Sequence, residues 1–153
     1  MLKRTFSFED TIAFGKDILR ELDQTGRRNI FLFGGLGAGK TTLVKGIGRE
    51  LGIEEEIISP TFQLVRNYDN SSGRVLAHID LYRSSSPEEI LGLGWWDYIE
   101  SPCITAVEWA ERAEGILPPD GLFVRMSFKS ETERDIEIFS SRDNVFADRN
   151  YNR

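Results

Sequence analysis

The stretch Gly34-Gly35-Leu36-Gly37-Ala38-Gly39-Lys40-Thr41 matches the pattern G-x-x-x-x-G-K-[ST]. An apolar run at residues 29–33 precedes it and predicts a buried strand, and residues 40–51 after it predict a helix. Successive N–H groups of such a glycine-rich turn form an anion-binding concavity, toward which the helix directs the positive end of its dipole. Strand, turn and helix together therefore predict a phosphate-binding loop (P-loop) in an α/β domain.

The P-loop pattern assigns a role to each of its polar side chains. We expect Lys40 to reach the β and γ phosphates and Thr41 to give its hydroxyl to Mg²⁺. The chain has no Asn-Lys-x-Asp segment of the kind that reads guanine, which favours ATP as the nucleotide. The expected nucleotide contacts in this stretch are Gly35, Leu36, Gly37, Ala38, Gly39, Lys40, Thr41 and Thr42.

Two acidic residues farther along the chain each follow an apolar run. Asp80 ends the run at residues 75–79, and Glu108 ends the run at residues 104–107. Because open α/β sheets bind ligands at the carboxyl ends of their strands, either residue could hold the metal or orient the attacking water. The sequence leaves the division of these roles open. Trp109, beside Glu108, is a further candidate for the site.

The segment Ser59-Pro60-Thr61-Phe62 lies about twenty residues after the P-loop. Pro60 fixes its own φ and favours extended conformations at Ser59, which would hold Thr61 in a defined place. Thr61 could sense the γ-phosphate there, as the residues of a switch loop do. A plain turn before a strand is the alternative interpretation.

The remaining patterns predict a single P-loop NTPase domain over residues 1–140. A helix is expected over about residues 9–23, and hairpins are expected within residues 63–79 and 122–139. The expected fold is α/β, with a mixed, mostly parallel central sheet and helices on both faces. Residues 141–153 are polar and are expected to form a loose C-terminal tail.

The composition argues against several classes of function. Asp and Glu number 25 against 19 Lys and Arg, a formal net charge of −6, so strong unaided binding to DNA or RNA is not expected. The single cysteine, Cys103, excludes an internal disulfide, and with a single histidine, His78, no structural zinc site is expected. No apolar stretch is long enough to cross a bilayer, and residues 1–10 lack the apolar region of a signal peptide. We therefore expect a cytoplasmic protein.

In order and spacing, these motifs resemble the TsaE family of bacterial ATPases in tRNA threonylcarbamoyladenosine biosynthesis. The resemblance covers roughly residues 5–139. It is carried by the P-loop, by residues 59–62, by His78-Ile79-Asp80-Leu81-Tyr82-Arg83 and by Val107-Glu108-Trp109-Ala110-Glu111-Arg112. The pair Trp95-Trp96 departs from the family's mixed acidic and aromatic residues, and we expect it at a core edge or in a partner contact.

The resemblance implies a Mg²⁺-dependent ATPase that supports modification of the adenosine beside the anticodon in certain tRNAs. It implies two partners, a TsaD-like threonylcarbamoyl transferase and its TsaB-like companion, with tRNA contacted only indirectly. It implies that Thr41 and Glu108 hold Mg²⁺ and that Thr11 lies near the adenine. It also implies that Asp80 lies near the phosphates and Thr61 in a switch-like loop. The residues expected to take part in catalysis are Lys40, Thr61, Asp80 and Glu108.

Two other activities remain open on the sequence alone. A small-molecule P-loop kinase would carry the same loop and could use Arg83 or Arg112 over the phosphates. A nucleotide-gated binding module would bind without useful turnover. Phosphate transfer to an acceptor, phosphate release and binding alone distinguish the kinase, the ATPase and the binding module.

Overall fold

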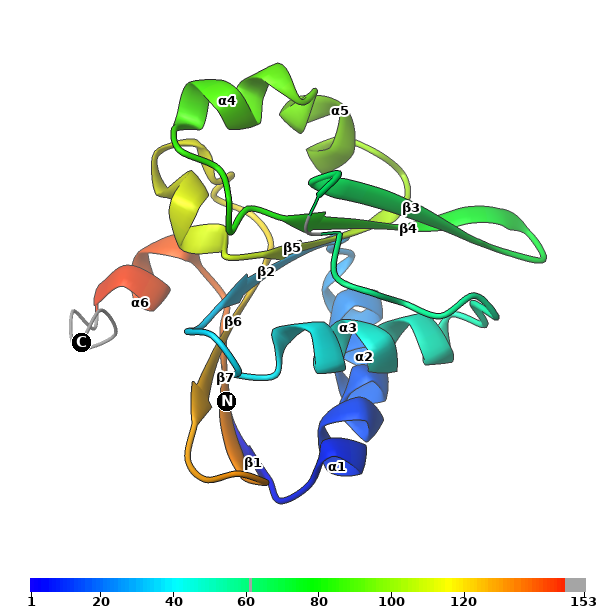
Figure 1. The fold of residues 1–153 in the computed structure, drawn as a ribbon, viewed down its shortest axis with the longest axis vertical. Helices are drawn as coiled ribbons and strands as arrows, with labels where there is room; N and C mark the ends of the chain where they lie inside the picture. Colours follow the sequence, from blue (N-terminus) through cyan, green and yellow to red (C-terminus); the bar gives the residue numbers. More distant parts are fainter. Residues whose placement is uncertain (61, 148–153) are drawn as a thin grey trace.

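The computed structural model describes residues 1–60 and 62–147 of the chain. Over these residues the protein forms one seven-stranded sheet with the strand order β1-β7-β6-β2-β5-β4-β3 (Figure 1). The strands are β1 (Leu2–Thr5), β2 (Asn29–Phe33), β3 (Val65–Asn70), β4 (Gly73–Asp80), β5 (Ile104–Glu108), β6 (Leu122–Phe128) and β7 (Arg134–Phe139). The predicted single α/β domain with a mixed sheet is thus confirmed.

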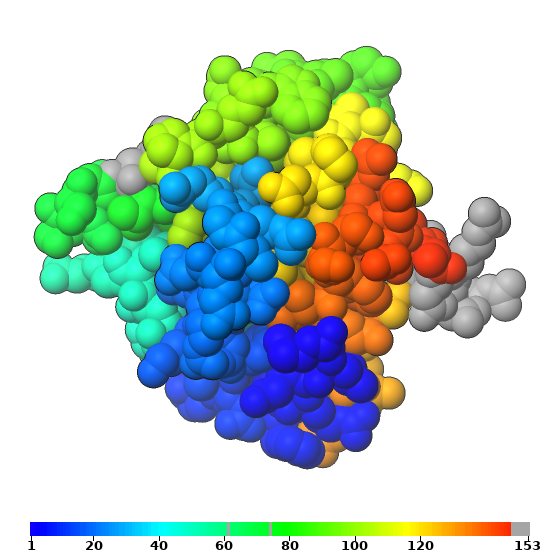
Figure 2. All heavy atoms as spheres, turned by 180° about the vertical axis from the view of Figure 1, so that it is seen from behind, coloured from blue at the N-terminus to red at the C-terminus, as the bar shows by residue number. Residues whose placement is uncertain are grey.

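The sheet is less parallel than the sequence predicts. Strands β4, β5, β2 and β6 form three parallel pairs, but β3 and β7 pair antiparallel with β4 and β6. Both are hairpin partners, and a tight turn can join only antiparallel strands. Strand β1, which was not predicted, then adds antiparallel to β7, and Figure 2 shows the blue N-terminal segment lying against the orange C-terminal strands. The two predicted hairpins are confirmed, but with β1 half of the six strand pairs are antiparallel, so the sheet is not mostly parallel.

Helices cover both faces of the sheet, as predicted (Figure 1). One face carries α1 (Phe8–Ala13), α2 (Gly15–Thr25) and α3 (Lys40–Glu50), and the other carries α4 (Pro87–Gly92), α5 (Trp95–Ile99), the 3₁₀ helix η1 (Ala110–Ile116) and α6 (Arg142–Ala147). No helix within the two described ranges is long and apolar enough to cross a membrane.

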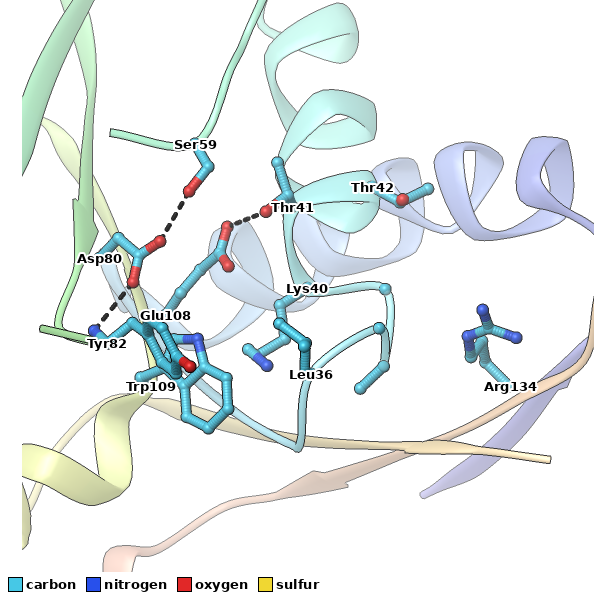
Figure 3. A pocket seen from close by; sticks show the side chains of 13 residues that line it. Leu36, Lys40, Thr41, Thr42, Ser59, Asp80, Tyr82, Glu108, Trp109 and Arg134 are labelled. Atoms are coloured by element: carbon cyan, nitrogen blue, oxygen red, sulfur yellow. Dashed lines mark hydrogen bonds between the residues drawn. The ribbon is translucent and has the colours of Figure 1, made fainter. Parts of the chain in front are cut away.

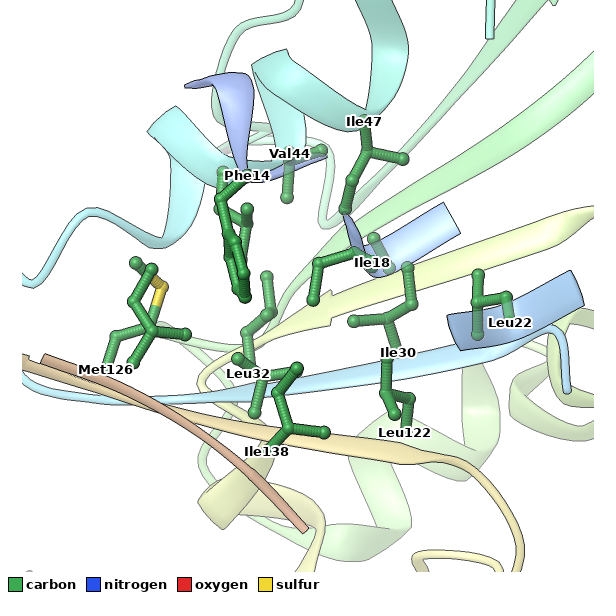
Figure 4. Close-up of a cluster of buried hydrophobic side chains, with 14 of the residues drawn as sticks. Phe14, Ile18, Leu22, Ile30, Leu32, Val44, Ile47, Leu122, Met126 and Ile138 are labelled. Atoms are coloured by element: carbon green, nitrogen blue, oxygen red, sulfur yellow. The ribbon is translucent and has the colours of Figure 1, made fainter. Parts of the chain in front are cut away.

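The alternation of side chains along β2 creates one apolar core on each face. Ile30 and Leu32 pack with α2 and α3, as Figure 4 shows, while Phe31 and Phe33 pack on the opposite side with α5 and η1. All four are fully buried, which is why the run at residues 29–33 is continuously apolar rather than alternating. Strand β2 is thereby held at the centre of the sheet, and the glycine-rich loop begins at its end.

The first predicted helix is divided at Phe14 into α1 and α2. Its start is capped by side chains, since the N–H of Asp10 donates to Ser7 Oγ and Asp10 Oδ2 accepts the N–H of Phe6. A Cβ on Gly15 would lie 2.3 Å from the backbone of Gly46 in α3, so the helix backbones are in direct contact there. This contact fixes the height of α3 above the sheet.

The C-terminal segment is more ordered than the expected loose tail. Residues from Arg142 to Ala147 form α6, with Val145 buried and the ring of Phe146 packed edge-on against Phe33. Two apolar side chains in a polar run are too weak a pattern to predict a helix. The helix forms because these two side chains pack against the core that contains Phe33. Residues 148–153 of the expected tail lie outside the described residues.

Candidate functional site

The glycine-rich loop leads from β2 directly into α3. Gly37 and Gly39 have φ angles of 75° and 98°, in the left-handed region that favours glycine, and Gly39 is the residue before the first helical position. The first intrahelical bond of α3 runs from the N–H of Leu43 to the carbonyl of Gly39. Within the turn the Ala38 N–H donates to the carbonyl of Gly35, whereas the first N–H groups of α3 have no intrahelical acceptor and can bind an external one.

A cavity of about 420 Å³ opens beside this loop (Figure 3). Its walls are residues 36–42 together with Ser59, Asp80, Tyr82, Glu108, Trp109 and Arg134. The structure thus brings together the predicted site residues Leu36, Gly37, Ala38, Gly39, Lys40, Thr41, Thr42, Asp80, Glu108 and Trp109. Gly35 does not line the cavity but accepts a hydrogen bond from the Lys40 ammonium group at 2.9 Å.

The two acidic residues are neighbours across the parallel strands β4 and β5. Asp80 and Glu108 end these strands and face each other in register. Thr41 Oγ1 donates to Glu108 Oε1 at 2.8 Å, and Ser59 Oγ donates to Asp80 Oδ2 at 2.6 Å. Both carboxylates are buried, with 5% exposure for Asp80 and 3% for Glu108, so these bonds compensate for the loss of water. Hydroxyl and carboxylate oxygens of this kind suit a small hard cation such as Mg²⁺.

No group of three or more His, Cys, Asp or Glu side chains within residues 1–60 and 62–147 could hold a metal by itself.

Lys40 is folded back onto its own loop. Its ammonium group donates to the carbonyls of Gly34 and Gly35 and lies 4.0 Å from the centre of the Trp109 ring. Burial lowers the pKa of Lys40, while the carboxylates of Glu108, Glu111 and Asp80 oppose that shift. Trp109 has a left-handed φ of 56°, rare for a bulky residue, and this strained backbone directs its ring over the lysine.

Thr11 lies next to the main cavity rather than in it. It lines a smaller adjoining pocket of about 90 Å³, which shares Gly39, Thr42 and Arg134 with the main cavity. Its hydroxyl donates to the carbonyl of Ser7 and bonds the hydroxyl of Thr5 at 2.9 Å. Thr61, the predicted switch residue, lies outside the described residues, so its expected role stays a prediction.

Several residues of the site were not predicted as functional. Arg134 reaches both pockets from the start of β7, and its Nε is buried with no hydrogen-bond partner among the described residues. Ser59 and Tyr82 belong to recognised motifs but contribute through Asp80, which accepts the Ser59 hydroxyl and the Tyr82 N–H. The buried His78 bonds Glu108 Oε1 at 2.8 Å. The sequence does carry a signal for His78. It lies two residues before Asp80 in the same strand, so the two side chains point to the same face of the sheet.

These features define a class: a single α/β domain in which a glycine-rich strand–loop–helix lies beside two carboxylates at the ends of parallel strands. The chain belongs to the TsaE family, since the family model described as "Threonylcarbamoyl adenosine biosynthesis protein TsaE" matches residues 5–136. The family predicted from the motifs is thereby confirmed.

Relatives in several bacteria support this assignment. The chain is 46% identical over 135 residues to the tRNA threonylcarbamoyladenosine biosynthesis protein TsaE of Nostoc, covering 85% of this chain and 80% of the relative. It is 37% identical over 132 residues to the protein of that name from Haemophilus influenzae, covering 84% and 82% of the two chains. The crystal structure of Bacillus subtilis YdiB superimposes with a TM-score of 0.70 and 29% identity, over 96% of this chain and 88% of that one.

Proposed function

We propose that this protein is a Mg²⁺-dependent P-loop ATPase that supports threonylcarbamoyl modification of the anticodon-adjacent adenosine of tRNA. The family's description and the names of the relatives support the pathway. The observation that carries the activity is the 2.8 Å hydrogen bond between Thr41 of the loop and Glu108 at the end of β5. It joins the loop that would hold the phosphates to the carboxylate that would hold the metal.

Nucleotide binding would use the loop and the start of α3. The free N–H groups of the first helical turn and the helix dipole favour a phosphate at this point. Lys40 would move from the carbonyls of Gly34 and Gly35 to the β and γ phosphates, which offer it a full negative charge. Thr11 and Arg134 line the adjoining pocket, where the adenosine end of the nucleotide would lie.

The metal would be held by Thr41 and Glu108, whose oxygens already lie within hydrogen-bond distance of each other. Mg²⁺ supplies neutralisation of the charge that develops on the phosphates during transfer. Asp80 would orient the attacking water, because Ser59 and the Tyr82 N–H hold both of its oxygens in place. Thr61 would complete the site from the adjoining segment.

The substitution Glu108→Gln tests this assignment of the chemistry. The amide keeps the shape of the side chain but loses the charge, so phosphate release should fall at least about tenfold, or about 1.4 kcal/mol of barrier. Nucleotide affinity in excess EDTA should stay close to that of the wild type. Glu114→Gln, which removes the same charge from an exposed position on η1, is the control and should leave turnover unchanged. Near-normal turnover of a folded Glu108→Gln protein would move the catalytic role to Asp80.

The proposal includes a TsaD-like transferase and a TsaB-like companion as partners, with tRNA reached only through them. The net charge of −6 disfavours direct capture of tRNA. Two side chains that line the cavity are exposed, Leu36 to 83% and Tyr82 to 43%, and Phe62, three residues after Ser59 of the cavity wall, is 86% exposed. A covering protein would bury them together with the nucleotide. Trp95 is no part of such a surface, because it is 2% exposed and belongs to the core.

Partner dependence has a quantitative test. ATP should tighten binding of the transferase pair by the same factor by which the pair tightens ATP, because coupling between two ligands is reciprocal. Phosphate release should be measured for the chain alone, with the transferase pair, and with the pair plus tRNA. We expect slow release alone and stimulation by the pair. Fast release that the pair leaves unchanged would contradict the proposal, and transfer to a small acceptor would favour a kinase.

A cytoplasmic location is also part of the proposal. Cys103 is the single cysteine of the sequence, so an internal disulfide cannot form, as suits a protein of a reducing compartment.

A further inference from the structure

His78 is placed by strand register to reach Glu108 diagonally across the sheet. It lies on β4 opposite Ala106 of β5, and Glu108 follows two residues later on the same face of β5. The small Ala106 side chain leaves room for the imidazole ring to extend toward its diagonal neighbour, a reach that long side chains commonly make. The result is a contact of 2.8 Å between His78 Nε2 and Glu108 Oε1 inside the protein, with His78 fully buried.

The chemistry of the two groups determines which one donates. A carboxylate oxygen accepts, so the ring nitrogen Nε2 carries the hydrogen and donates it to Glu108. The other ring nitrogen, Nδ1, is buried and has no hydrogen-bond partner among the described residues. If this side chain only filled space, an apolar side chain would be more favourable here, because a buried polar nitrogen without a hydrogen-bond partner is destabilising. The hydrogen bond from Nε2 to Glu108 is therefore the interaction that favours a histidine at this position.

Two donors meet on one oxygen of Glu108. Thr41 and His78 both donate to Oε1, whereas no described residue donates a hydrogen bond to the other oxygen, Oε2. The two donors differ in their supports: Thr41 is at the end of the glycine-rich loop, whereas His78 is on a strand between β3 and β5. We expect the donor on the sheet to keep its position if the loop rearranges around a nucleotide, because the neighbouring strands hold β4 on both sides.

We infer that His78 is a positioning residue, which holds Glu108 through Oε1 in the orientation in which its carboxylate would bind Mg²⁺. This inference rests on the proposed function, because it concerns the metal side of that site. Partners of metal-binding carboxylates orient their ligands, and their loss commonly lowers metal affinity about 10- to 100-fold. His78 acts through Glu108 and need not touch the nucleotide.

The first test is spectroscopic and needs no activity. His78 is the only histidine among the 153 residues, so an untagged, ¹⁵N-labelled chain gives the signals of one imidazole. We expect a hydrogen on Nε2, both in the protein alone and with Mg²⁺ and a non-hydrolysable ATP analogue, because Nε2 faces a carboxylate oxygen. Glu108→Gln should shift the Nε2 signal, and Glu114→Gln should not. A ring with its hydrogen on Nδ1 alone would overturn the inference.

The second test uses a matched pair of variants. His78→Gln keeps an N–H donor at nearly the same reach, and His78→Met keeps the length without a donor. For His78→Met we expect the Mg²⁺ concentration at half-maximal nucleotide binding to rise about 10-fold or more, with nucleotide affinity in EDTA within about twofold of the wild type. His78→Gln should recover most of the Mg²⁺ response.

The outcomes separate this inference from the proposed function. If wild-type protein binds nucleotide no better with Mg²⁺ than with EDTA, the metal-dependent function fails, whatever the variants do. If the wild type responds to Mg²⁺ and His78→Met responds equally, the positioning role is overturned while the function stands. Should His78→Met fail to fold, the tautomer of the wild-type ring and its response to Glu108→Gln decide the question.

Discussion

Replacing Lys40 with methionine is expected to remove most nucleotide binding without lowering the thermal stability of the protein. Lys40 is the one cation of the glycine-rich loop, and bonds from a charged donor to a charged acceptor contribute about 1.5–3 kcal/mol. The affinity for ATP and ADP should therefore fall by roughly 10- to 100-fold. Methionine keeps an unbranched side chain of similar length and places an apolar end where the ammonium group now lies against the Trp109 ring, so the walls of the cavity should remain in place.

The stability part of this prediction follows from the pKa of Lys40. Burial lowers that pKa below the ordinary value of 10.5, which means that the folded protein binds this proton less tightly than the unfolded chain does. The folded state therefore carries an unfavourable charge at neutral pH, and the penalty disappears as the pH rises toward 10.5. We expect the thermal midpoint of Lys40→Met to equal or exceed that of the wild type at pH 7, and the difference to shrink under alkaline conditions.

Calorimetric titration with ADP and a thermal scan at two pH values measure both effects. Lys45→Met, on the same helix but away from the cavity, is the matched control and should bind ADP normally. Unchanged ADP affinity in folded Lys40→Met protein would contradict the assignment of the loop. A clearly lower midpoint would mean that the bonds to Gly34 and Gly35 outweigh the burial of the charge.

A single methyl group at Gly46 is expected to disrupt the packing that supports the site. A Cβ there would lie 2.1 Å from the carbonyl oxygen of Ile12, and Gly15 meets the same stretch of α3 from the next helix. Neither contact can be relieved by a side chain moving, because the clashing atoms are backbone. Overpacking of this kind costs typically 1–3 kcal/mol or more, against about 1 kcal/mol gained from the better helix propensity of alanine.

We therefore expect Gly46→Ala to lower the free energy of unfolding by about 2 kcal/mol or more, which is roughly 4–8 °C in midpoint for a chain of this size. Because α3 must shift to relieve the clash, Lys40 and Thr41 at its start should also bind nucleotide less well. Urea unfolding and ADP titration test the two consequences.

The control is Gly92→Ala at the exposed end of α4, where an added Cβ meets nothing within 4 Å. That change should be neutral or slightly stabilising. If Gly46→Ala were as stable as Gly92→Ala, the close approach of α1 and α3 would not be a constraint on the fold.

Much of the site could be predicted from the chain because its signals are local. The order of glycines before Lys40 and Thr41 follows from the backbone that an anion-binding turn requires. Asp80 and Glu108 could be placed at strand ends because each terminates a short apolar run. Those strands proved to be neighbours, which the sequence did not state but which the crossover rules for parallel strands made reasonable.

Other features could not be predicted because their partners lie far away along the chain. The break at Phe14 lies beside the close contact of Gly15 with Gly46, which belongs to another helix. Helix α6 is held by Val145 and Phe146, which pack against the core on the opposite face of the sheet. Arg134 belongs to a hairpin with no motif of its own, yet it reaches the loop through the order of the strands.

By itself, then, the sequence determined the glycine-rich turn between strand and helix, the class of fold and the acidic residues that end the strands, because these depend on residues close together in the chain. Only the tertiary structure decided which of these residues touch. The bond from His78 to Glu108 spans 30 positions and exists because register sets the two side chains diagonally with a small Ala106 between them. Pairing of that kind is a property of packed strands, which no local pattern encodes.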